Sequence, residues 1–229
     1  MRKLPFVLYL IVAFTHLAGI LLALPTLITF TKPLLLPLLA ISFLWNTLRP
    51  LSAFAKTILL AFFFSWLGDV LLMRAGQTTF FLAGLGAFFL AQVSYIRAFG
   101  WFPRRGIRIF RTRPWLVLPF VLYLAAMLWM LWPGLDAGLR IPVVVYSLAL
   151  VTMGIFATGM LDKVKMSTAY LLIAGAILFI LSDSCIALDR FSGWSLWQPR
   201  LLIMGTYIAA QGLLCRGAIR ASAHGRYPI

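Results

Sequence analysis

Eight long apolar segments divide the sequence and constrain its fold more than any other feature. Charged residues, prolines and glycines separate the segments, which lie near residues 5–24, 33–48, 54–73, 79–99, 115–132, 140–160, 168–188 and 199–216. A helix that crosses the hydrocarbon core of a bilayer needs roughly 20 mainly apolar residues. Eight such spans with short loops take up nearly all of the 229 residues. The sequence therefore predicts an all-α, polytopic membrane helix bundle that forms one domain over residues 1–229.

The composition excludes an ordinary soluble domain, because 63% of the residues are hydrophobic and only 11% are charged. The net charge of +15 would suggest nucleic-acid binding in a soluble protein. Here the basic residues lie between apolar segments, as the positive-inside rule for membrane proteins predicts. We therefore expect membrane lipids, and no nucleic acid, as partners.

The first apolar segment has features of a signal peptide, since the basic residues Arg2 and Lys3 precede it. It has the length of a span, however, and ends at Leu24-Pro25 rather than at a small-x-small cleavage site. We interpret it as the first transmembrane helix. The second segment is short, and we expect Pro33 in its first turn and Pro37 at a kink or local unwinding.

The distribution of basic residues predicts the orientation of the bundle. If eight spans alternate, 15 of the 20 lysines and arginines fall on the side of the N-terminus. The other side holds Lys32, Arg74, Arg140, Arg190 and Arg200. This bias predicts that both termini face the cytoplasm. The most basic stretch, Arg104 to Arg113, is interpreted as an anchor beside anionic headgroups or as a lipid or partner site. The short loops favour a bacterial plasma (inner) membrane, and the sequence leaves the oligomeric state open.

Two aspartates fall inside predicted spans. The chain has no glutamate, and we expect Asp136, Asp162 and Asp189 in loops, whereas Asp69 and Asp183 interrupt apolar segments. A carboxylate at membrane depth costs a few kcal/mol and suggests a function. The alternative is a protonated or hydrogen-bonded aspartate that only ties helices together.

The two aspartates are predicted to share one depth on helices that run in the same direction. Asp69 lies five residues before Arg74, and Asp183 lies six residues before Asp189. At about 1.5 Å of rise per residue, each carboxyl group is roughly 8 Å below the same boundary. Such a pair suits unequal titration, with one member as an acid and the other as a base.

Other polar residues are expected at compatible depths in the bundle, and they are Lys32, Gln92, Tyr146, Tyr207 and Gln211. Lys32 suits a carboxylate or a substrate phosphate as a partner, or else it is a lysine that reaches the membrane interface. The tyrosines and glutamines either take part in a site or form hydrogen bonds between helices. Gly68-Asp69 and Ser182-Asp183 also hint at a parallel repeat of four helices in each half.

The sequence lacks the residues that a metal site or a serine nucleophile would need. His16 and His224 are the only histidines, so we expect no metal site and no cofactor. A Gly-x-Ser-x-Gly elbow is absent from the sequence. Cys185 and Cys215 lie in predicted spans, where we expect them to pack as small residues.

Several motifs, in order along the chain, carry a family resemblance. They are Lys32-Pro33 with Pro37-Leu38-Leu39, Leu67 to Leu72, Gly84 to Tyr95, Ser182-Asp183 with Ala187-Leu188, and Tyr207 to Gln211. With these motifs the sequence resembles the lysoplasmalogenase-like YhhN membrane proteins. Gln92 departs from the family pattern, in which this position is often histidine. If that histidine shuttles protons, the role here moves to Asp69, Asp183 or Tyr95.

The resemblance implies a membrane-embedded hydrolase of lysophospholipid-type substrates. The reaction would cleave the vinyl ether bond of a lysoplasmalogen, and release a fatty aldehyde and glycerophosphoethanolamine or glycerophosphocholine. Asp69 and Asp183 would then be the acid and the base, in an order that the sequence leaves open. Lys32 and Tyr146 or Tyr207 would orient the headgroup and the carboxyl groups. A proton-coupled transporter or a non-catalytic lipid-binding protein is the alternative, since paired intramembrane carboxylates suit it as well.

Overall fold

A computed structural model describes residues 3–47, 49–74, 76–100, 102, 108–194 and 197–224 of the chain. Within these ranges every regular element is helical. The α-helices are α1 (Leu4–Leu21), α2 (Pro25–Asn46), α3 (Ala53–Leu72), α4 (Thr78–Gly100), α5 (Arg108–Thr112), α6 (Leu118–Leu131), α7 (Ala137–Thr158), α8 (Met166–Phe191) and α9 (Pro199–His224). Three short 3₁₀ segments, Pro114–Leu116, Trp132–Gly134 and Gly159–Asp162, flank α6 and follow α7. Among the described residues, eight helical stretches are long and apolar enough to cross a membrane, which confirms the predicted fold class.

The second span differs from its predicted bounds. It was expected at 33–48, but α2 begins at Pro25 and ends at Asn46. The predicted start followed from the charge of Lys32 and the proline after it. The helix nevertheless continues before them, where Thr29 and Thr31 donate to the carbonyls of Pro25 and Leu27, one turn back in the same helix. Lys32 therefore lies two turns inside the helix and not at its start.

Both prolines of the second segment lie inside α2. Because Pro37 has no N–H, the carbonyl of Pro33, four residues earlier, loses its helical partner. The indole Nε1 of Trp66 in α3 donates to that carbonyl at 3.0 Å. A neighbouring helix thus satisfies the backbone group that the proline frees, as transmembrane bundles require.

Two further helices extend beyond their predicted ends. Helix α8 continues to Phe191, so Asp189 lies in the helix and not in a loop as expected. The turn that follows contains Gly193 at φ +71°, a conformation that favours glycine. Helix α9 continues to His224, whereas its span was expected to end at residue 216. Charged side chains are compatible with the part of a helix that projects beyond the hydrocarbon core of the bilayer. The position of a charged residue in the sequence therefore does not mark where such a helix ends.

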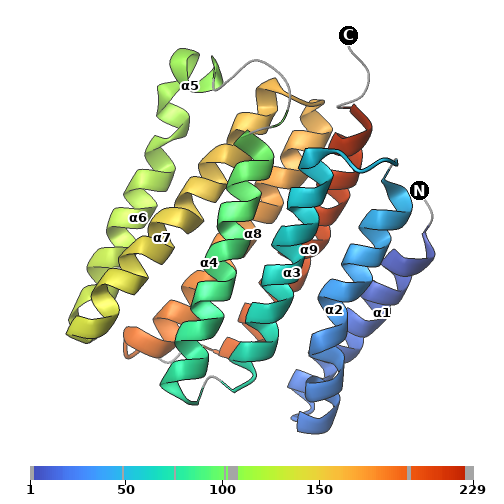
Figure 1. Cartoon of the computed structure of the whole chain (residues 1–229). Coiled ribbons are helices and arrows are strands. Elements are labelled where there is room, and N and C mark those ends of the chain that lie inside the picture. Colours follow the sequence, from blue (N-terminus) through green and yellow to red (C-terminus); the bar gives the residue numbers. More distant parts are fainter. Residues whose placement is uncertain are drawn as a thin grey trace.

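The long helices form antiparallel neighbours that assemble into one bundle (Figure 1). The closest pairs are α1 with α2, α3 with α4, and α8 with α9, while α7 packs against α4 and α8. Helix α6 lies at one edge, and only 6% of the residues in its apolar stretch, Pro114–Gly134, are buried. Helix α1 begins and α9 ends at one end of the bundle. At the opposite end, called the distal end below, α1, α3, α6 and α8 end and α2, α4, α7 and α9 begin.

Glycines set the close approach of the helices that carry the two aspartates. A Cβ at Gly68 in α3 would lie 2.6 Å from the ring of Phe88 in α4. A Cβ at Gly175 in α8 would lie 2.8 Å from the Leu214 side chain and 3.0 Å from the carbonyl of Ala210 in α9. The Phe88 ring of α4 therefore packs directly on the backbone of α3, and α8 and α9 approach backbone to backbone.

The predicted basic anchor lies largely outside the described residues. Arg104 and Arg105 are not described, and neither is the side chain of Arg108. The lipid-anchor interpretation of this stretch stays a prediction.

Candidate active site

Asp69 is held by residues from two other helices. It lies in the last turn of α3 and is only 3% exposed. The hydroxyl of Tyr207, from α9, donates to Asp69 Oδ2 at 2.7 Å. The ammonium of Lys32, from α2, lies 3.9 Å from Asp69 Oδ1. We call Lys32, Asp69 and Tyr207 the Asp69 cluster.

Aromatic packing fixes the Tyr207 hydroxyl on this carboxylate. The ring of Tyr207 meets Phe88 and Phe179 edge to face, with centroids 5.9 Å and 5.7 Å away. Edge-to-face contacts restrict ring orientation. Ser182 also donates to the carbonyl of Ile203 at 3.0 Å, and this bond joins α8 to α9 near the same level.

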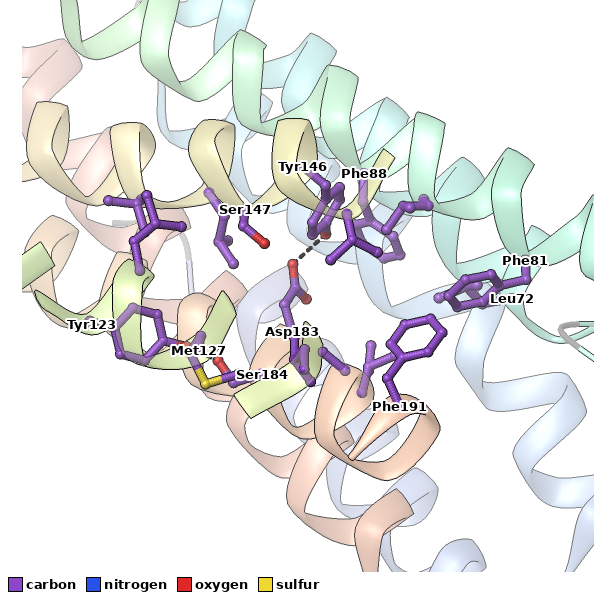
Figure 2. Close-up of a pocket in the computed structure, with 18 residues that line it drawn as sticks. Leu72, Phe81, Phe88, Tyr123, Met127, Tyr146, Ser147, Asp183, Ser184 and Phe191 are labelled. Carbon is purple, nitrogen blue, oxygen red and sulfur yellow. Dashed lines mark hydrogen bonds between the residues drawn. The ribbon is translucent and has the colours of Figure 1, made fainter. Parts of the chain in front are cut away.

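Asp183 is held by a second, separate set of donors. It lies in α8 and is 7% exposed. Gln92 Nε2, from α4, donates to Asp183 Oδ2 at 3.3 Å. The hydroxyl of Tyr146, from α7, donates to the same oxygen (Figure 2). Among the described residues, no ion pair and no hydrogen bond to Oδ1 involves Asp183. We call Gln92, Tyr146 and Asp183 the Asp183 cluster.

Tyr95 and Gln211 form a third, fully buried pair between α4 and α9. The Tyr95 hydroxyl donates to Gln211 Oε1 at 2.8 Å. Each residue lies near one of the clusters, since Gln92 precedes Tyr95 in α4 and Tyr207 precedes Gln211 in α9. Within the described part of the chain, Gln211 Nε2 and Gln92 Oε1 are buried without a hydrogen-bond partner. Such atoms cost stability, so they call for an explanation in function or in a bound molecule.

The structure thus brings all eight predicted site residues into two clusters and one adjoining pair. The distances of the two aspartates from the ends of their helices, however, do not reproduce the predicted shared depth. Asp69 lies three residues before the end of α3 (72 − 69), and Asp183 lies eight before the end of α8 (191 − 183). Phe88 lies between the clusters, because it contacts Tyr207 and lines a cavity together with Asp183.

A narrow apolar cavity of about 60 Å³ lies beside Asp183 (Figure 2). Its walls come from α3, α4, α6, α7 and α8, and most of the lining side chains are aliphatic or aromatic. The polar groups that line it are Asp183, Tyr146, Ser147, and the hydrogen-bonded pair Tyr123 and Ser184. Tyr123 and Ser184 were not predicted from the sequence, although Tyr123 carries the one hydroxyl group between Leu118 and Leu131.

A wider and more polar cavity of about 670 Å³ lies at the distal end. Its lining includes Lys32 and three charged residues that were not predicted as site residues, namely Asp189, Arg190 and Arg200. The signal that could have found them is their position, since all three were expected to flank the same end of the bundle as Asp69. The narrow and the wide cavity share Leu72, Phe81 and Ile186 in their walls.

His16 also belongs to the wall of the wide cavity. It is fully buried in α1, and its Nδ1 lies 2.8 Å from the Thr31 hydroxyl. Its Nε2 has no hydrogen-bond partner among the described residues. From the sequence, His16 was considered as a metal ligand and as the base for a serine nucleophile, and neither role was expected. In the part of the chain that the structure describes, no three His, Cys, Asp or Glu residues lie together as metal ligands would.

The geometry supports acid–base chemistry at a polar–apolar boundary. Asp69 has a cation beside it, which favours the carboxylate form, whereas Asp183 has only neutral donors and an apolar cavity next to it. Carboxyl groups in such different surroundings can act as an acid and as a base in one reaction.

Comparisons with known proteins cover the whole of this site. The YhhN family profile matches residues 27–218, an interval that contains all eight predicted site residues. The chain is 31% identical to "Lysoplasmalogenase TMEM86B" of Homo sapiens over 190 residues, which are 81% of this chain and 74% of the human protein. It is 32% identical to "Lysoplasmalogenase TMEM86A" of Bos taurus over 173 residues, 73% of this chain and 67% of the bovine protein. No solved structure matches the chain.

Proposed function

Since the chain belongs to the YhhN family, we propose that it hydrolyses the vinyl ether bond of lysoplasmalogens within the membrane. The human and bovine relatives are both named lysoplasmalogenases, which supports this activity. The observation that carries the proposal is the pair of buried aspartates, which have different partners and lie near two adjoining cavities of opposite polarity.

Vinyl ether hydrolysis needs a proton on carbon before water can add. Protonation of the β-carbon gives an oxocarbenium ion, water adds to its α-carbon, and the resulting hemiacetal collapses. The products are a fatty aldehyde and glycerophosphoethanolamine or glycerophosphocholine. The reaction calls for a neutral carboxylic acid, and for a carboxylate that accepts the proton of the attacking water.

Asp183 is the proposed proton donor. Gln92 and Tyr146 both donate to its Oδ2, so Oδ1 is the oxygen left to carry a proton. The apolar cavity beside it favours the neutral acid and suits the hydrocarbon of an alkenyl chain. Transfer of this proton to the β-carbon leaves Asp183 as a carboxylate near the cationic intermediate.

Asp69 is the proposed base for the attacking water. Lys32 and Tyr207 engage its two oxygens and stabilise the carboxylate. It takes a proton from water as the C–O bond forms, and returns that proton to the leaving glycerol oxygen. The hemiacetal hydroxyl gives its proton to Asp183, which restores the starting state of both groups.

Gln92 is proposed to position Asp183 rather than to shuttle protons, because an amide does not titrate in this range. Tyr95 supports Gln92 from the next turn of α4, Gln211 supports Tyr207 from the next turn of α9, and the two supporting residues are hydrogen-bonded to each other. The two aspartates then carry every proton that the reaction moves.

The orientation and the location of the protein belong to the proposal as well. We propose that both termini face the cytoplasm and that the distal end, with the wide cavity, faces the outer side of a bacterial plasma membrane. The excess of basic residues on the side of the termini supports this orientation.

Purified protein in detergent tests the proposed activity. Incubation with 1-alkenyl-lysophosphoethanolamine should release fatty aldehyde, and Asp69→Asn and Asp183→Asn should each lower the rate by at least about 100-fold. Asp162→Asn is the matched control, since Asp162 is exposed at the end opposite the clusters. If both site variants keep the parental rate, the proposed roles are wrong. A transporter would release no aldehyde from any of the four proteins.

A further inference from the structure

The wide polar cavity carries charges of both signs on its wall. Lys32, Arg190 and Arg200 supply cations, and Asp189 supplies an acid. Guanidinium and ammonium groups bind phosphate, and a carboxylate binds an ammonium group. A ligand that carries a phosphate next to an amine matches this set of charges.

Two cations of the cavity, Lys32 and Arg200, are placed where an outside ligand could reach them. The 3.9 Å between Lys32 Nζ and Asp69 Oδ1 is too long for a hydrogen bond, so the ammonium is attracted to Asp69 and keeps its N–H donors. Arg190 is stacked on the Phe81 ring with its guanidinium carbon 3.8 Å from the centroid, which sets the plane of its donors. Arg200 is exposed in the first turn of α9.

The size and the position of the cavity agree with a headgroup site. Its volume of about 670 Å³ is in the range of small-molecule sites. It adjoins the narrow apolar cavity through Leu72, Phe81 and Ile186. In a lysoplasmalogen the vinyl ether lies between the glycerophosphate and the hydrocarbon. A lipid that crosses this shared wall therefore brings the vinyl ether near Asp183, which lines the narrow cavity, and near Lys32, which lines the wide cavity beside Asp69.

We infer that the wide cavity binds the zwitterionic headgroup of the lipid. Lys32 and Arg200 receive the phosphate, Asp189 receives the amine, and the narrow cavity takes the start of the alkenyl chain. This assignment rests on the proposed function and adds to it a substrate direction and a preference for amine-bearing phosphodiesters over anionic phosphomonoesters.

Calorimetric binding of soluble headgroups to the full chain in detergent tests the site without catalysis. The probes are glycerophosphoethanolamine, glycerol 3-phosphate and inorganic phosphate. Arg200→Gln should weaken the binding of glycerophosphoethanolamine and of glycerol 3-phosphate alike, by roughly five- to tenfold. Asp189→Asn should weaken the binding of glycerophosphoethanolamine alone, because glycerol 3-phosphate has no amine.

Arg140→Gln is the matched control, since Arg140 lies at the same end of the bundle but stacks on Trp132 outside the cavity. Equal effects of all three variants would overturn the assignment, and so would tight binding of inorganic phosphate in place of glycerophosphoethanolamine. Headgroup binding without aldehyde release would contradict the proposed activity and leave the headgroup site standing. Aldehyde release by variants with unchanged binding and unchanged KM would contradict the headgroup site alone.

Discussion

The Tyr207 hydroxyl donates a 2.7 Å hydrogen bond to Oδ2 of Asp69, from a position 138 residues further along the chain. This bond and the Lys32 ammonium engage both oxygens of one carboxylate. Asp183 is held instead by neutral donors on a single oxygen. The difference between these partners is the basis for assigning unequal roles to two residues of the same type.

Tyr207→Phe should lower kcat by about tenfold, because it removes the donor to Asp69 and keeps the ring between Phe88 and Phe179. The rate of aldehyde release by purified protein is the measurement. Tyr170→Phe is the control, since Tyr170 is 55% exposed on α8. A rate equal to that of the control would show that Asp69 does not depend on this bond.

Gln92→Leu should slow aldehyde release by roughly tenfold, because Asp183 then keeps only the donor from Tyr146. Gln92→His puts a ring N–H donor in place of the amide donor. It should recover much of the rate and add a titrating limb to the pH–rate profile. If Gln92→Leu were as active as Gln92→His, the positioning role would be contradicted.

Lys163→Met should destabilise the protein without changing the KM for lysoplasmalogen. Lys163 is 8% exposed, and its ammonium donates to the carbonyls of Phe99 at 2.7 Å and Gly100 at 3.4 Å, at the end of α4. Methionine leaves those carbonyls without this donor, at a cost of about 1–3 kcal/mol. Thermal unfolding in detergent, compared with Lys165→Met, measures the difference. A loss of activity at unchanged stability would place Lys163 in the site instead.

The same lysine predicts a pH dependence of stability. Burial lowers the pKa of Lys163 below its ordinary value of 10.5. The unfolded chain therefore holds this proton to a higher pH than the folded chain does, and the free energy of unfolding should gain as the pH rises from the folded pKa toward 10.5. When the unfolding of the parent and of Lys163→Met is measured across this pH interval, the free energy of unfolding should increase in the parent only. Parallel curves for the two proteins would contradict the shift.

Single cysteines should report the orientation of the bundle. In a background with Cys185→Ala and Cys215→Ala, Gln77→Cys lies exposed at the distal end and Ser167→Cys lies exposed at the other. A membrane-impermeant maleimide added to intact cells should label residue 77 and leave residue 167 unlabelled until the cells are opened. The reverse pattern would overturn the proposed orientation.

Sequence reasoning located the two aspartates because a charge within an apolar run is conspicuous. It could not pair them with their donors, since Tyr146 and Tyr207 both lie at compatible depths. The structure pairs Tyr207 with Asp69 and Tyr146 with Asp183, and these choices depend on how α7 and α9 rotate and pack. The eight spans were predictable for a similar reason, since length and apolarity are local properties.

The start of α2 and the wide cavity were not predictable in the same way. Thr29 and Thr31 have side chains that suit either a loop or a membrane helix, and the choice depends on bonds to their own backbone. His16, Lys32, Asp189 and Arg200 come from four helices and meet only through packing. The repeat of four helices in each half and the orientation of the bundle in the membrane stay predictions, because no contact between side chains tests them.

Helix α6 forms one wall of the narrow cavity, although only 6% of the residues in its apolar stretch are buried. One side of that wall therefore borders the acyl chains of the bilayer, while the wide cavity lies at the distal end. In the proposed reaction this separates the exits of the two products. The aldehyde can diffuse sideways into the leaflet while the freed headgroup departs into water, so turnover does not require both to leave by one route.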